Sequence, residues 1–213
     1  MGVLDDAAQR MSDLGLFPLG IVLLPTEHLP LHIFEDRYKE LIEECLETES
    51  EFGLVYADDD GIRDIGTRAR VVEVLTRFED GRLNILVEGG ERFQLDALTD
   101  GRSFQTGEIS PVEDDDDPAE AASIDEALRL FGVLREVTES EVDPPESDAP
   151  QLSFALAGKV DLPSEVKLEL LREVSERRRI DRVQDLLENA ALTAQRIRRA
   201  AARASTNGRV DLE

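Results

Sequence analysis

The chain changes its residue pattern once, close to Pro111, and this change limits the folds that are open to it. Before Pro111, short runs rich in β-branched residues alternate with Gly, Pro and Asp turns, which predicts strands. After it, apolar residues recur every three or four positions, which predicts helices. We therefore expect an α+β fold in consecutive parts: a β-subdomain over residues 14–111, an acidic linker over 112–122 and a helical bundle over 123–204.

The first part is predicted to hold one helix among short antiparallel strands. The Asp80-Gly81 pair is a strong hairpin signal, and Gly89-Gly90 predicts a break where the backbone bends or approaches another strand closely. This pattern fits a small barrel or a sandwich. Strands are expected over residues 16–24, 52–56, 68–78, 83–87, 93–97 and 104–109. The helix is indicated by an apolar stripe of Phe34, Tyr38, Leu41, Ile42 and Cys45.

The second part is predicted to hold four helices. Ser164 and Ser175 are suited to cap the third and fourth helices. The last helix carries a heptad seam over residues 180–201, which favours packing within the bundle but also allows an oligomer to form through it. The seam consists of Ile180, Val183, Leu187, Ala190, Ala194, Ile197 and Ala201.

Composition excludes several classes of protein. The net charge of −24, from 48 acidic and 24 basic residues, disfavours nucleic acid as a partner. A single cysteine, Cys45, cannot form an internal disulfide or a thiolate metal site, and its place on the apolar stripe favours a buried hydrophobe over a nucleophile. No apolar run is long enough to span a membrane, and the first residues lack a secretory pattern. These features predict a cytoplasmic protein.

Two short patterns resemble catalytic or metal-binding motifs. His28 and His32 are four residues apart, but Pro30 between them prevents a helix, and an extended segment separates them by about 13 Å. Ser164 and Lys167 match an S-x-x-K string, but the companion strings S-D-N and K-T-G are absent. We interpret the S-x-x-K string as accidental, and we expect His32 to be a hydrogen-bonded structural residue and not a metal ligand.

Other ligand-binding motifs are missing from the sequence. No G-x-x-x-x-G-K-[ST] string exists to bind a nucleoside triphosphate. The acidic clusters at residues 58–60 and 114–117 lack the spacing of a calcium loop, so a solvated turn and a linker are expected there. The sequence therefore predicts no catalytic residue, no cofactor and no metal ion.

Several strings in the first part resemble the N-terminal substrate-recognition domain of Lon proteases. The resemblance implies a PUA-like β-barrel followed by a helical bundle, and recognition of unfolded or damaged polypeptide on behalf of a protease. In length the chain resembles free-standing relatives without ATPase or peptidase modules, and Asp36 stands where many relatives have Pro. The strings are Phe17-Pro18-Leu19, Leu24-Pro25, Leu29 to Phe34 with Arg37-Tyr38, Phe52-Gly53, Ile65-Gly66-Thr67, Asp80 to Leu83 and Glu91-Arg92-Phe93.

We therefore expect a non-catalytic module that binds exposed apolar polypeptide, in protein quality control or as an adaptor for a separate protease. Peptides commonly add to a sheet edge or lie in an apolar groove. The candidate binding residues are Leu29, Leu31, Phe34, Tyr38 and Phe78, and the structural alternative is that Leu29, Leu31 and Phe34 fill the barrel core. Alternative functions are RNA binding, through a PUA-like barrel and the basic end at residues 196–203, and hydrolysis by Ser164 and Lys167.

Overall fold

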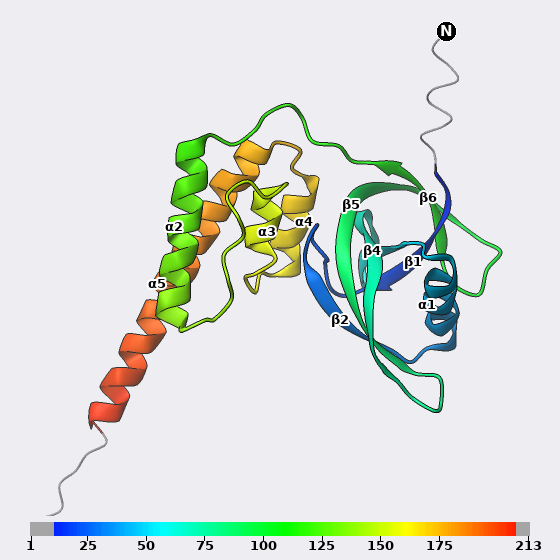
Figure 1. The fold of residues 1–213 in the computed structure, drawn as a ribbon, viewed down its shortest axis with the longest axis horizontal. Coiled ribbons are helices and arrows are strands. Elements are labelled where there is room, and N and C mark those ends of the chain that lie inside the picture. The colour runs from blue at the N-terminus through cyan, green and yellow to red at the C-terminus, as the bar shows by residue number, and fades with distance from the viewer. Residues whose placement is uncertain (1–10, 208–213) are drawn as a thin grey trace, which may run out of the picture. The chain divides into compact units, whose positions relative to one another are not determined.

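A computed structural model describes residues 11–207 of the chain and the exposure of side chains 13–201. Strands fill the first part of the chain and helices the second, which confirms the α+β prediction (Figure 1). The strands are β1 (Met11–Leu19), β2 (His28–Ile33), β3 (Phe52–Asp58), β4 (Gly61–Arg77), β5 (Leu83–Thr99) and β6 (Thr106–Pro111). The helices are α1 (Asp36–Thr48), α2 (Ala121–Thr138), α3 (Leu152–Ala157), α4 (Ser164–Arg172) and α5 (Glu176–Asn207).

Five of the strands form a barrel-like ring in the order β5-β4-β3-β1-β6, and β6 pairs again with β5. The sixth strand, β2, pairs with the first half of β5. All pairs are antiparallel except β1 with β3, which run parallel from Leu16 opposite Gly53 to Leu19 opposite Tyr56. The chain between these two strands is long enough for a crossover, because it contains β2 and α1.

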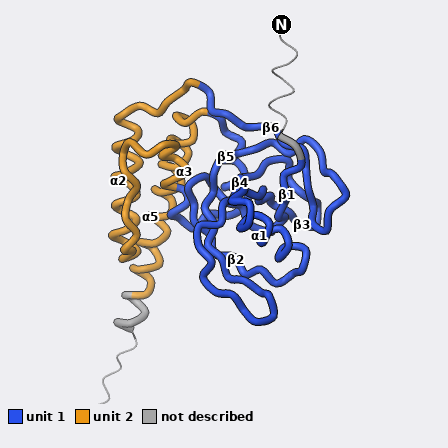
Figure 2. Tube along the Cα trace, turned by 45° about the vertical axis from the view of Figure 1, so that its right-hand side comes forward, with its two compact units in different colours: residues 1–115, 157–174 blue, residues 116–156, 175–213 orange. Residues whose placement is uncertain are grey.

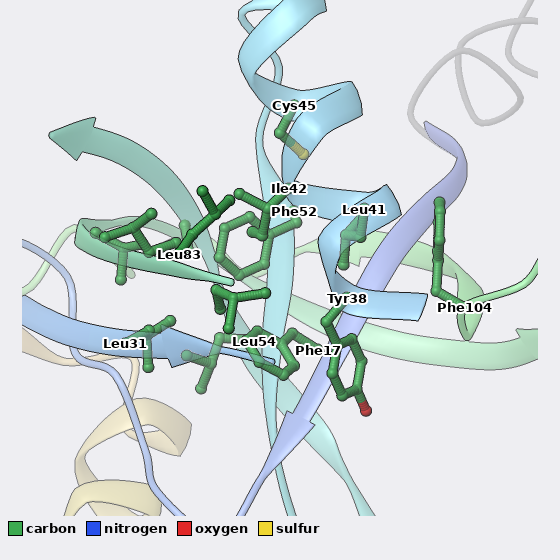
Figure 3. Packing of buried hydrophobic residues seen from close by; sticks show 14 of the residues in the cluster. Phe17, Leu31, Tyr38, Leu41, Ile42, Cys45, Phe52, Leu54, Leu83 and Phe104 are labelled. Atoms are coloured by element: carbon green, nitrogen blue, oxygen red, sulfur yellow. The ribbon is translucent and has the colours of Figure 1, made fainter. Parts of the chain in front are cut away.

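The main core of the ring lies under α1. Leu83, Ile85 and Val87 alternate inward along β5, as period two requires, and are at most 1% exposed. Figure 3 shows the apolar face of α1 turned toward side chains from the strands. The rings of Phe17 and Tyr38 lie 4.1 Å apart. The predicted helix stripe is confirmed for Tyr38, Leu41, Ile42 and Cys45.

Two local predictions in the ring differ from the structure. Phe34 does not belong to the helix stripe, because the N-cap of α1 is Glu35 and Phe34 precedes it. Gly89-Gly90 does not break the strand, since β5 runs through both residues. A close approach is present there, but to a loop and not to a strand: a Cβ atom on Gly89 would lie well within 3.0 Å of the Leu24 carbonyl oxygen.

The chain forms two compact units, of residues 1–115 with 157–174 and of residues 116–156 with 175–213 (Figure 2). The helix α4 thus groups with the ring, whereas the sequence placed it in the bundle. Side chains of the first unit explain this grouping. Lys167 of α4 pairs with Glu27 at 2.5 Å, and Arg92 of β5 donates to the carbonyl oxygens of Leu171 and Glu173 at 2.7 and 3.0 Å.

The second unit packs α2 against α5, and Arg179 is buried within it. The Arg179 guanidinium lies 4.4 Å from the ring centre of Phe154 and donates to Ser153 Oγ at 3.0 Å and to Glu176 Oε2 at 2.6 Å. Pairing of this kind offsets the high cost of burying a charge. The apolar side chains buried in this unit include Ala127, Leu130, Phe131, Ile180, Val183 and Leu187.

The heptad seam of α5 is buried only over its first half. Ile180, Val183 and Leu187 are at most 1% exposed, whereas Ile197 is 66% exposed. The first half therefore packs within the unit, and association through the second half stays a prediction.

The two helix caps have different outcomes. Ser175 caps α5 as predicted, because its Oγ accepts the Arg178 amide at 3.0 Å. Ser164 does not cap α4: the N-cap is Pro163, whose carbonyl oxygen accepts the amides of Val166 and Lys167. Ser164 is already the first helical residue, so the prediction for it is wrong.

Candidate functional site

Three side chains at one end of the ring form an exposed group that we call the aromatic surface: His32, Phe34 and Phe78. The His32 ring stacks on Phe34 at 5.9 Å and meets Phe78 edge-on at 6.1 Å. Phe34 is 59% exposed and Phe78 is 36% exposed. Large apolar side chains that gather on a surface commonly mark an interaction site.

The alternation of β2 explains why His32 and Phe34 face outward. Leu31 and Ile33 point into the core, so His32 between them points away from it. His32 lies opposite Asn84 of β5, and its Nδ1 is 2.6 Å from the Asn84 side-chain oxygen. Phe34 continues the outward row where the strand has ended, just before the N-cap of α1.

The hairpin between β4 and β5 positions Phe78. The Phe78 amide donates to the Arg82 carbonyl oxygen at 2.9 Å, and Gly81 adopts the positive φ of 82° that its turn requires. The Arg82 guanidinium lies 5.0 Å from the centre of the Phe78 ring, a cation–π distance. Hydrogen bonds from the Arg82 backbone amide and side chain lower the pKa of Asp80. The Asp80-Gly81 hairpin predicted from sequence thus holds Phe78 in place.

Of the five candidate binding residues, two lie in the aromatic surface. Phe34 and Phe78 are brought together there, 44 residues apart in sequence. Leu31 and Tyr38 are 8% and 5% exposed in the main core, and Leu29 packs against that core partly buried. Burial raises the pKa of Tyr38, which is consistent with a structural role. The candidate set missed His32, although the alternation of Leu29, Leu31 and Ile33 already indicates its outward direction.

Ion pairs border the aromatic surface. Arg37 pairs with Glu35 at 2.8 Å, and Lys39 pairs with Asp36 at 3.1 Å. Arg82 pairs with Asp80 at 2.7 Å on the hairpin. The two sides of this border are close, because a Cβ on Gly81 would lie 3.9 Å from Lys39 Cδ.

The residues considered for catalysis have other roles in the structure. Lys167 is engaged by Glu27 and by the Val22 carbonyl oxygen, at 2.5 and 3.4 Å. The Cys45 thiol is buried in the main core, and this burial raises its pKa, which disfavours the reactive thiolate.

The acidic and histidine patterns do not converge on a metal. His28 and His32 lie opposite Glu88 and Asn84, which are four residues apart on β5. Asp58 accepts from Arg63 at 2.6 Å, and Asp117 accepts two bonds from Arg177 at 2.9 and 3.1 Å. Within residues 11–207, no group of three potential metal ligands is found.

The helices of the described residues also lack a membrane-spanning segment. None of them combines the length and the apolar composition that a bilayer crossing requires.

Comparison with protein families gives a match over most of the chain. Residues 13–189 match the model of the family described as "ATP-dependent protease La (LON) substrate-binding domain". The matched model is that of a substrate-binding domain and not of an ATPase or a peptidase.

Curated relatives and solved structures agree with this match. The chain is 28% identical over 180 residues to Lon protease of Paraburkholderia phytofirmans, covering 77% of this chain, and 30% identical over 187 residues to that of Anaeromyxobacter dehalogenans, covering 78%. It spans only 22% of the length of each of these relatives.

Among solved structures, a Lon N-terminal domain protein from Xanthomonas campestris matches with a TM-score of 0.64 and 29% identity, over 81% of this chain and 97% of that one. The N-terminal domain of a Mycobacterium avium complex Lon protease has the same fold, with a TM-score of 0.61 at 19% identity, over 83% of this chain and 98% of that one.

Proposed function

We propose that this chain, which belongs to the family of Lon protease substrate-binding domains, binds exposed apolar segments of unfolded polypeptides through the aromatic surface. The observation that carries the proposal is the exposure of Phe34 and Phe78, whose rings both contact His32. Leu29, Leu31 and Tyr38 are outside this surface, because they belong to the main core or pack against it.

Phe34 and Phe78 both gain free energy from contact with an apolar segment. An aromatic side chain that leaves water contributes a large apolar area, and rings in contact gain further from edge and stacking contacts. Each phenylalanine has only two side-chain torsions to order on binding, so the entropy cost per ring is small. Two exposed aromatic side chains that both contact His32 are therefore a suitable anchor for apolar side chains of an unstructured segment.

The test is binding of a permanently unfolded, cysteine-alkylated model protein, measured by fluorescence anisotropy. We expect a measurable Kd for the unaltered chain and binding weakened by about tenfold or more in the Phe34→Ala/Phe78→Ala double variant. Leu98→Ala is the matched control, because Leu98 is 51% exposed at the opposite end of β5. No interaction up to high micromolar concentration, or equal binding by all three proteins, contradicts the proposal.

We also propose that the chain serves protein quality control by presenting bound polypeptide to a separate protease. The family membership supports this role, since the matched relatives are named as proteases. Adding the chain to a reaction of an ATP-dependent protease from the same cell should change the degradation rate of an unfolded substrate. The Phe34→Ala/Phe78→Ala variant should lose the effect, and an unchanged rate with the unaltered chain would reject the role.

A further inference from the structure

The basic side chains that border the aromatic surface are each neutralised by a neighbouring acid. Arg37, Lys39 and Arg82 pair with Glu35, Asp36 and Asp80, respectively. A cation already engaged in such a pair has a weaker attraction for a further anion. The border therefore offers little to a negatively charged ligand.

The acids of this border outnumber its bases by one. Glu35, Asp36 and Asp80 offset Arg37, Lys39 and Arg82, and the Asp36 side chain is 98% exposed. Glu79, which follows Phe78 in the hairpin, is exposed and forms no ion pair with the residues that the structure describes. The border therefore carries an excess negative charge, at Glu79, that can receive a positive group.

Two further features favour a positively charged ligand. The net charge of −24 creates a field that attracts cationic segments and repels anionic ones, over a Debye length of about 8 Å at physiological salt. The aromatic rings also attract cations through their faces, as Arg82 already shows on Phe78. Phe34, which stacks on His32, is 59% exposed and has room for a ligand's Lys or Arg.

From these observations we infer that the aromatic surface selects apolar segments flanked by Lys or Arg over the same segments flanked by Asp or Glu. The inference rests on the proposed function, because it names the class of polypeptide that this surface takes. Apolar side chains of the segment contact Phe34 and Phe78, while its flanking cations lie beside Asp36 and Glu79.

The experiment compares two labelled peptides that share one apolar core and differ only in their flanks, two Lys or two Glu on each side. Anisotropy titrations of the full chain are expected to give a Kd about tenfold or more lower for the Lys-flanked peptide at low salt. The ratio should shrink as salt rises, because the border is exposed to solvent. Phe34→Ala should weaken both peptides alike, since it removes the shared apolar contact.

A charge-reversal variant separates the effect of the border acids on this preference from the effect of the net charge. Glu79→Lys should reduce the preference for the Lys-flanked peptide, whereas Glu141→Lys, an equal charge change at an exposed position in the second unit, should leave it largely intact. Equal losses in the two variants would assign the preference to net charge and overturn the local part of the inference.

The outcomes distinguish this inference from the proposed function. If both peptides bind equally and both depend on Phe34, apolar recognition stands and the charge preference is wrong. If only the Lys-flanked peptide binds and Phe34→Ala has no effect, the contact is electrostatic attraction alone and both proposals fail. If neither peptide binds, both also fail.

Discussion

Single residues in this fold differ sharply in how much change they tolerate, and two glycines show the extremes. The Gly89 amide donates to the Glu27 carbonyl oxygen at 2.9 Å, and its own carbonyl oxygen accepts from Thr26 at 2.7 Å. These two hydrogen bonds hold the loop that precedes β2 against β5. Gly132, inside α2, is exposed, and a Cβ atom added to it would have no described neighbour within 4 Å.

The same substitution should therefore have opposite effects at the two positions. Gly89→Ala is expected to destabilise the chain by about 1–3 kcal/mol or more, because the added methyl group would collide with the Leu24 carbonyl. Gly132→Ala is expected to stabilise it by about 0.5–1 kcal/mol, since alanine favours the helix. Chemical denaturation followed by circular dichroism measures both, and a neutral Gly89→Ala would contradict the described packing.

At the scale of elements, α4 is tied to the loop between β1 and β2 by one ion pair. Lys167 and Glu27 have side chains only 13% and 10% exposed, and Glu27 also accepts the Leu24 amide at 2.9 Å. Removing one partner of a pair this buried leaves the other charge without compensation. The pair thus couples two segments that are 140 residues apart in sequence.

A double-mutant cycle tests this coupling. Lys167→Met alone is expected to cost about 3–5 kcal/mol of unfolding free energy, because it leaves the Glu27 carboxylate buried without its cation. Adding Glu27→Gln should recover part of that loss, with a coupling energy of about 0.5–3 kcal/mol. Strict additivity of the two single losses, measured by urea denaturation, would show that the two side chains do not interact.

Elements whose pattern is local were predictable from sequence. The hairpin at Asp80-Gly81 follows from its turn residues, the alternation of β5 from period two, and the stripe of α1 from its helical spacing. Prediction of secondary structure failed where contacts with residues distant in sequence determine the conformation. Val22, Leu23 and Leu24 read as a strand but form a buried loop, because partners such as Thr67, whose Oγ donates to the Leu23 carbonyl, hold them there.

The candidate site was also predictable only in the part that depends on local sequence pattern. Phe34 and Phe78 were among the candidate binding residues, but only the paired register of β2 and β5 brings them to His32. Leu31 and Tyr38 belong to regular apolar patterns, and a regular pattern marks the core more often than a binding surface. Phe34, which the helical spacing had placed among the buried residues, lies outside the helix and is exposed.

At the scale of the whole molecule, acid should weaken both units. Arg172 lowers the pKa of Asp64 in the first unit, and Arg177 lowers that of Asp117 in the second, in each case chiefly by a side-chain hydrogen bond. A carboxyl group whose pKa is depressed by folding adds stability above its unfolded value, here near 3.8, and loses it as pH falls through the folded value. Both units are thus expected to lose stability as the pH falls below about 3.8.

Asp117→Asn checks this in the second unit. The variant should be less stable than the unaltered chain near pH 7, and the difference should shrink toward zero as pH falls below about 3.8. The matched control is the same substitution in an Arg177→Met background, where the pH-dependent difference should be much reduced. Thermal unfolding from pH 7 to pH 3 gives the measurement, and a difference independent of pH would contradict the role of the Arg177 pair.

The return of residues 157–174 to the first unit also has a consequence for synthesis. A ribosome releases the six strands long before α4, so the early portion emerges without the Lys167 and Leu171 groups that Glu27 and Arg92 bind. The nascent ring therefore lacks these contacts while residues 116–156 of the other unit are translated. The contacts of Glu27 and Arg92 with α4 form only when α4 has left the exit tunnel.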